Sequence, residues 1–229
     1  MLTEADYRIF LDILIREVLP RMNYLDKLQI LEACCGTGMF GRKIINVLRY
    51  KKRIIITGVD ISNNAIDYLR KLKIKNYLPI CENILRKDLF NDNFFNIIIC
   101  PFALHHFLKN ELKVFIKNAH RWLKLGGVVI AIEPNGSNPI LGISSKVGEI
   151  YKFIFPGNKY ISPHEKVYSC RFYNKIFLSF GFTKIYEARV RIRGKLPPMG
   201  FIIKLLVVIK NHLSGIFGSN VVVLVYKKI

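Results

Sequence analysis

Apolar and polar residues follow two alternating patterns along most of the chain. Short apolar runs rich in β-branched residues predict strands, and the stretches between them carry apolar positions at helical spacing. The predicted strands cover residues 28–33, 53–60, 77–81, 95–100 and 127–133. The predicted helices cover residues 3–19, about 39–50, 62–73 and a segment that ends at Leu125-Gly126-Gly127. Strands that alternate with helices predict a parallel sheet with helices on both faces.

The C-terminal third of the chain has a different pattern. After a loop at 134–168, a helix is predicted at about 170–180, and residues 182–193 alternate as a half-exposed strand does. A last strand at 220–228 follows without a usual crossover, which predicts an antiparallel hairpin at the end of the sheet. The 229 residues therefore predict a single domain, with an N-terminal cap helix at about 1–20 and an apolar helical insert at about 194–219.

Charge and cysteine usage narrow the class of partner without naming it. Thirty-six basic against sixteen acidic residues give a net charge of +20, which favours anionic partners, although scattered solvated lysines would give the same number. Nucleic acid is the less favoured of these partners, because no long basic run or RNA-recognition aromatic motif appears.

The five cysteines have no metal-ligand spacing and predict buried, reduced thiols, so no metal is expected. No signal peptide is recognisable at the N-terminus, and a cytoplasmic location is expected.

The motif that carries chemistry is a strand, a glycine turn, a helix and a second strand. The sequence reads ILEACCGTG over 30–38 and VDIS over 59–62, and Gly36 to Gly41 also forms a literal GxGxxG. That spacing fits a dinucleotide, but a carboxylate at Glu32 would repel a pyrophosphate beside the turn. The same carboxylate would attract the sulfonium and ammonium groups of S-adenosylmethionine. The methyl donor is therefore favoured over a dinucleotide and over a glycine turn without a ligand.

These motifs together resemble the class I S-adenosylmethionine-dependent methyltransferases over about residues 28–190. The motif NIIICPFALHHF matches the family's fourth-strand motif, and LKLGGVVIAIEPN matches its fifth strand. The resemblance implies an α/β Rossmann-like, doubly wound seven-stranded sheet. That sheet would be mostly parallel with an antiparallel last strand and helices on both faces. It implies S-adenosyl-L-methionine as the cofactor.

The resemblance also assigns cofactor-binding positions. They are Glu32, Ala33, Cys34, Gly36, Thr37, Gly38, Asp60, Ile61, Asn83, Ile84 and Pro101. Asp60 would accept the ribose hydroxyls and Ile61 would cover one adenine face. Two positions depart from the family pattern: Cys34 stands where glycine is usual, and Asn83 stands where an acidic residue usually accepts the adenine amino group. An amide oxygen can accept the same hydrogen bond.

Methyl transfer needs alignment of donor and acceptor more than a catalytic triad, and a general base only where the acceptor keeps a proton. His106 and His105 are the candidates for that base, since they follow the fourth predicted strand, although a packing and capping role is the alternative. His164 is the candidate for contact with the substrate, against an ordinary loop role.

The identity of the methyl acceptor is the property that the sequence determines least. The insert at about 194–219 is too interrupted by charge to span a membrane, and it predicts an interfacial helix, a substrate lid or a helix packed on the sheet. We expect a small, lipid-like, quinone-like or glycan-linked acceptor, with the protein peripheral at the inner membrane face and its anionic lipid. The alternatives are an RNA methyltransferase, a non-catalytic donor-binding subunit and an NAD-dependent oxidoreductase.

Overall fold

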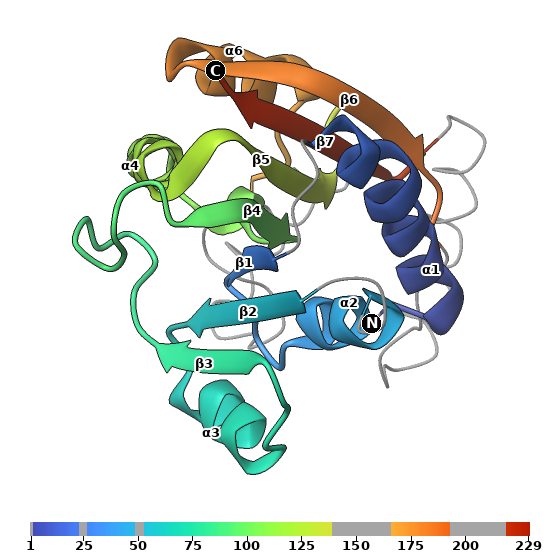
Figure 1. Cartoon of the computed structure of the whole chain (residues 1–229). Helices are drawn as coiled ribbons and strands as arrows, with labels where there is room; N and C mark the ends of the chain where they lie inside the picture. The colour runs from blue at the N-terminus through green and yellow to red at the C-terminus, as the bar shows by residue number, and fades with distance from the viewer. Residues whose placement is uncertain (1, 23–26, 49–52, 139–165, 193–218) are drawn as a thin grey trace, which may run out of the picture.

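The computed structural model describes residues 2–22, 27–48, 53–138, 166–192 and 219–229, and these form one seven-stranded sheet (Figure 1). The strands are β1 (Lys27–Ala33), β2 (Arg53–Asp60), β3 (Tyr77–Cys81), β4 (Phe95–Pro101), β5 (Leu123–Pro134), β6 (Phe182–Val190) and β7 (Val221–Lys228). Their order across the sheet is β3-β2-β1-β4-β5-β7-β6. Strands β1 to β5 pair in parallel, and β7 runs antiparallel between β5 and β6. The predicted fold class is confirmed.

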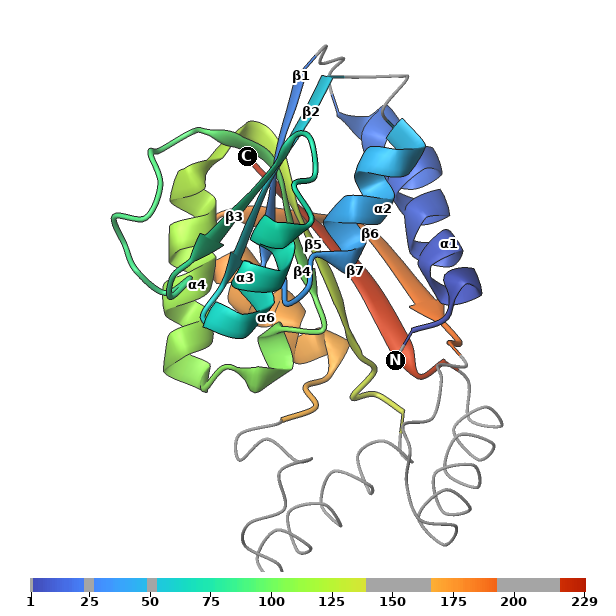
Figure 2. The same cartoon turned by 90° about the horizontal axis from the view of Figure 1, so that it is seen from below.

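Helices cover both faces of the sheet, which Figure 2 shows nearly edge-on. The helices are α1 (Glu4–Ile13), η1 (Leu14–Val18), η2 (Leu19–Arg21), α2 (Met39–Leu48), α3 (Asn63–Lys71), η3 (Leu104–His106), α4 (Lys109–Trp122) and α6 (Cys170–Ser179). Side chains of α1, α2 and α3 share one hydrophobic core with one face of the strands. Side chains of α4 and α6 share the second core with the other face. Alternation along each strand produces this division: Ile30 faces the first core and Leu31 the second.

Two predicted boundaries need correction. The N-terminal helix begins after a capping box at Thr3, but it changes to a π turn at Leu14 and to a 3-10 turn that includes Pro20. Proline is tolerated there because the first turn of a helix leaves its N–H groups unpaired. The helix predicted to end at Leu125-Gly126-Gly127 ends at Trp122, because β5 begins at Leu123. Most of the 134–168 loop and of the 194–219 insert lies outside the described residues.

Candidate active site

A cavity of about 530 Å³ opens at the carboxyl ends of the strands. Its position is set by topology: from β1 the chain builds the sheet toward β3, and from β4 it builds in the opposite direction, so the loops after β1 and β4 diverge. The lining residues are Cys34, Val59, Asp60, Ile61, Glu82, Asn83, Ile84, Leu85, Phe102, Ala103, His106, Phe107 and Glu111. The volume is within the range of small-molecule sites.

One residue of the glycine turn after β1, Cys34, lines this cavity. Cys34 adopts a left-handed φ of 52°, so the turn keeps the glycine-like backbone there despite a Cβ. Burial raises the pKa of its thiol to about 12, which keeps it protonated. Gly36 also has a left-handed φ of 52°, and a Cβ added at that position would meet nothing within 4 Å. The space above the turn is therefore open to a ligand that approaches the backbone.

Asp60 and Ile61 stand opposite that turn at the end of β2. One carboxylate oxygen of Asp60 accepts from the Gly36 N–H at 2.7 Å, and the other accepts from the Ser62 N–H at 2.9 Å. Ile61 is 73% exposed, which is unusual for a large apolar residue. A carboxylate beside an uncovered apolar side chain fits a ligand with vicinal hydroxyls and a flat ring.

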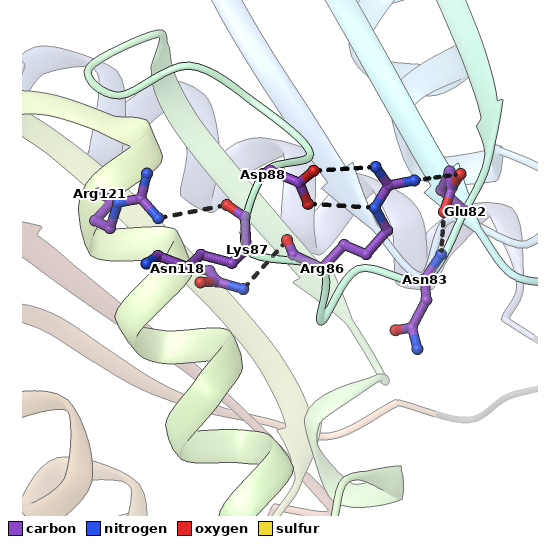
Figure 3. A network of polar contacts seen from close by, with 7 residues as sticks. All are labelled: Glu82, Asn83, Arg86, Lys87, Asp88, Asn118 and Arg121. Atoms are coloured by element: carbon purple, nitrogen blue, oxygen red, sulfur yellow. Dashed lines mark hydrogen bonds and ion pairs between the residues drawn. The ribbon is translucent and has the colours of Figure 1, made fainter.

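The loop after β3 brings Asn83 and Ile84 to the cavity, and polar contacts tie it to α4 (Figure 3). Asn118, which is buried on α4, donates to the Leu85 carbonyl at 3.1 Å. Arg121 of α4 pairs with Asp92 at 2.7 Å. The side-chain oxygen of Asn83 accepts from the Leu85 N–H at 2.9 Å, so it shapes the loop as well as facing the cavity.

Glu32 lies beneath the glycine turn rather than in the cavity. Its Oε2 accepts from the Tyr77 hydroxyl at 2.7 Å and from the Gly41 N–H at 3.0 Å, while its Oε1 has no partner among the described residues. Burial raises the pKa of this carboxyl to about 7. The Tyr77 ring reaches this position because Gly58 has no Cβ; one added there would lie 2.2 Å from the Tyr77 oxygen. Glu32 therefore supports the turn from below.

A second buried carboxylate, Glu133 at the end of β5, organises the loop after β4. It accepts from the backbone N–H groups of Ala103 at 3.0 Å, Leu104 at 2.8 Å and His105 at 3.2 Å. The His105 ring nitrogen Nδ1 lies 2.7 Å from the same carboxylate. His105 is buried, whereas His106 is exposed and lines the cavity, and the two ring centroids are 4.0 Å apart. Of the two histidines, His106 is the one placed to meet an acceptor.

The cavity brings together six of the residues proposed from the sequence. They are Cys34, Asp60, Ile61, Asn83, Ile84 and His106. Seven others are close in the chain but do not line it: Glu32, Ala33, Gly36, Thr37, Gly38, Pro101 and His105. His164 lies outside the described residues. Sequence reasoning missed Phe102 and Phe107, although both flank the histidine pair in the FALHHF segment.

The described ranges lack two kinds of feature. They contain no group of three or more His, Cys, Asp or Glu side chains arranged to hold a metal ion. No helix within them is both long enough and apolar enough to cross a bilayer.

The region that contains these motifs is similar to known methyltransferases. A model of the methyltransferase domain matches residues 30–127. A demethylmenaquinone methyltransferase of Staphylococcus epidermidis is 27% identical over 143 residues, which cover 62% of this chain and 57% of that protein. A malonyl-[acyl-carrier protein] O-methyltransferase of Buchnera aphidicola is 27% identical over 184 residues, which cover 75% of this chain and 66% of that protein. The chain thus spans less than two thirds of both relatives.

A solved structure is also similar over most of its length. An S-adenosylmethionine-dependent methyltransferase of Methanosarcina mazei superposes with a TM-score of 0.64 at 15% identity, over 90% of this chain and 94% of that chain. At that identity the similarity concerns the fold.

Proposed function

We propose that the chain is a class I S-adenosylmethionine-dependent methyltransferase and that it methylates a small lipid-like or quinone-like acceptor. The observation that carries the proposal is the cavity at the topological switch point. Its lining includes Asp60 and Ile61, which we assign to a donor side, and Phe102 and Phe107, which we assign to an apolar acceptor side. The His106 imidazole also lines this cavity.

The donor side fits S-adenosylmethionine in three respects. The space above Gly36 admits a ligand close to the backbone, Asp60 presents a carboxylate for ribose hydroxyls, and Ile61 presents an exposed apolar surface for adenine. When bound, this cofactor supplies a methyl group on a sulfonium, which is already activated for in-line displacement. The residues of the chain then have to hold and align the acceptor, and such alignment alone contributes roughly 7–11 kcal/mol in favourable cases.

On the acceptor side, apolar residues and one base have separate tasks. Phe102 and Phe107 exclude water and pack against an apolar ring. His106 accepts a proton from an acceptor hydroxyl, since it is the exposed imidazole that lines the cavity. Glu133 acts through the loop: its hydrogen bonds to Ala103, Leu104 and His105 hold the backbone that presents His106.

The names of the relatives and the charge of the chain support the class of acceptor. One relative is named for demethylmenaquinone and another for a malonyl-[acyl-carrier protein], and the first of these acceptors is a quinone. A net charge of +20 suits a peripheral position at an anionic membrane face, where an apolar acceptor is dissolved.

Calorimetric titration with S-adenosylhomocysteine, in parallel with NADH, tests the donor half. We expect micromolar binding of S-adenosylhomocysteine alone. Ile61→Ala should weaken this binding roughly fivefold to tenfold, because adenine loses apolar contact area. Leu125→Ala is the matched control, since Leu125 is 78% exposed near the opposite end of the sheet and should leave binding unchanged. Binding of NADH in place of S-adenosylhomocysteine would overturn the proposal.

The acceptor half requires transfer of a labelled methyl group. A short-chain demethylated naphthoquinol, a malonyl-carrier protein and total RNA serve as the three probes, with purified full chain and S-adenosylmethionine. Transfer to the quinol supports the proposed acceptor class. Transfer to the carrier protein or to RNA alone would replace it.

A further inference from the structure

The helices α4 and α6 form one continuous layer over the sheet. Near their N-termini, the Lys109 ammonium lies 5.9 Å from the centroid of the Phe172 ring. Near their C-termini, the His120 ring packs 5.2 Å from Phe182, which follows α6 directly. Both helices pack on the same core, on the side of the sheet opposite α1 and α2 (Figure 2). Their outward faces therefore lie on the same side of the sheet, and we call them together the α4/α6 face.

This face is strongly and unevenly charged. The two helices carry six basic residues and one acidic residue: Lys109, Lys113, Lys117, Arg121, Arg171 and Lys175 against Glu111. Helix α1, on the other side of the sheet, carries three acidic residues and one basic residue. Together, helices α1, α2 and α3 carry five basic and four acidic residues, so the excess of positive charge among the described α-helices lies mainly on α4 and α6.

The cations of α4 recur at every fourth position, which keeps them along the exposed side of the helix. Lys113 and Lys117 are exposed, whereas Phe115 and Ile116 between them are buried. In the part of the chain that the structure describes, neither ammonium pairs with a carboxylate; Asp92 pairs with Arg121 instead. These two neighbouring charges, which have no carboxylate partner among the described residues, are available to an external partner.

Apolar side chains are interspersed with these cations. Val114 on α4 is 44% exposed and Leu178 on α6 is 52% exposed. Leu108, 48% exposed, lies at the start of α4, where Phe107 and Glu111 line the cavity. A nucleic-acid backbone would attract the cations but has no use for exposed aliphatic side chains. A bilayer surface uses both, since lysines meet lipid phosphates while aliphatic groups enter the boundary of the acyl chains.

We infer that the α4/α6 face docks on an anionic lipid bilayer and brings the cavity beside the start of α4 to the lipid headgroups. The inference rests on the proposed function in one respect, because an acceptor dissolved in the bilayer is what gives this orientation its use. Bound in this way, the protein presents Phe107 and His106 at the end of the face that an acceptor from the membrane reaches first.

Sedimentation of the full chain with vesicles of phosphatidylglycerol and phosphatidylcholine tests the inference, with vesicles of phosphatidylcholine alone as the neutral reference. Each removed lysine should weaken partitioning about fivefold, so Lys113→Gln/Lys117→Gln should weaken it about 25-fold. Lys71→Gln/Lys75→Gln is the matched control. It removes the same charge from exposed positions in and just after α3, near the β3 edge of the sheet, and should weaken partitioning less than twofold. Val114→Ser/Leu178→Ser should weaken partitioning severalfold and leave binding to an RNA homopolymer unchanged.

Several outcomes would overturn the inference. The first is that the unmodified chain does not sediment with anionic vesicles. The second is that both lysine pairs reduce partitioning equally. The third is that Lys113 and Lys117 are needed for binding to the RNA homopolymer but not for binding to vesicles. Titration with S-adenosylhomocysteine on the same variants separates the two proposals. Intact donor binding with no vesicle binding removes the docking surface only, whereas absent donor binding in the unmodified chain removes the proposed function.

Discussion

The buried carboxyl of Glu32 makes the stability of this fold depend on pH in a defined direction. Burial raises its pKa from 4.5 to about 7, although the hydrogen bonds from Tyr77 and Gly41 act in the opposite direction and lower it. A carboxyl whose pKa is higher in the folded state keeps its proton longer there than in the unfolded chain. The folded state therefore binds more protons across this window, and the free energy of unfolding falls as pH rises from about 4.5 to 7.

The magnitude follows from the two pKa values. With 4.5 for the unfolded chain and about 7 for the folded one, the contribution of Glu32 falls by about 2.5 kcal/mol between pH 5 and pH 8. Glu32→Gln removes this ionisation. The glutamine oxygen still accepts from Tyr77 and Gly41, and its amide nitrogen replaces the unpartnered Oε1 at a cost that does not change with pH.

The assay is denaturant unfolding of the unmodified chain and of Glu32→Gln at several values from pH 5 to pH 8, without ligand. From pH 5 to pH 8, the free energy of unfolding of the variant should rise by about 2.5 kcal/mol relative to that of the unmodified chain. This change corresponds to roughly 5–10 °C in melting temperature. Glu187→Gln is the matched control, because a hydrogen bond from Lys184 lowers the pKa of Glu187 from its ordinary value of 4.5. This carboxyl is therefore ionised in both states from pH 5 to pH 8, and the curve of Glu187→Gln should stay parallel to that of the unmodified chain. Parallel stability curves for the unmodified chain and Glu32→Gln would refute the reasoning.

Three further predictions concern neighbouring groups. Tyr77→Phe removes a hydrogen bond that lowers the pKa of Glu32, so it should cost about 1–3 kcal/mol and extend the pH window upward, as measured by the same unfolding series. Glu133→Ala leaves three backbone N–H groups and the His105 ring without their acceptor, so we expect thermal unfolding to show a stability loss of at least about 3 kcal/mol. A loss below about 1 kcal/mol would contradict the role of Glu133 in holding the loop after β4. His106→Ala, at an exposed position, should change stability by less than about 1 kcal/mol and lower methyl transfer roughly 10²- to 10⁴-fold, and unchanged turnover of an acceptor hydroxyl would exclude it as the base.

Local sequence pattern was sufficient to predict much of the proposed donor side of the cavity. The apolar runs placed the parallel strands within a few residues of their observed bounds, because strand and helix periods are read from neighbours in the chain. Asp60 and Ile61 could be found in the same way, since a residue that ends a parallel strand must emerge at the carboxyl edge of the sheet. Cys34 shows the limit of motif matching, because its left-handed φ preserves a glycine-like turn without glycine.

The acceptor side and the buried carboxylates depended on contacts between distant segments. Tyr77 lies 45 residues beyond Glu32, and nothing in either segment alone predicts their hydrogen bond. Three glycines leave room for the Tyr77 side chain: Gly38, Gly41 and Gly58. Glu133 similarly reaches a loop about 30 residues earlier in the chain.

The sequence by itself determined the alternating architecture and the placement of Asp60 and Ile61 at the carboxyl edge of the sheet, because these follow from local periodicity and from a short motif. The tertiary structure decided which carboxylate faces the cavity and which lies buried beneath the turn. It also decided which histidine is exposed and that the cations of α4 and α6 share one surface. The physical reason is that burial and pairing, which set the charge and the accessibility of a side chain, depend on neighbours that the fold brings together.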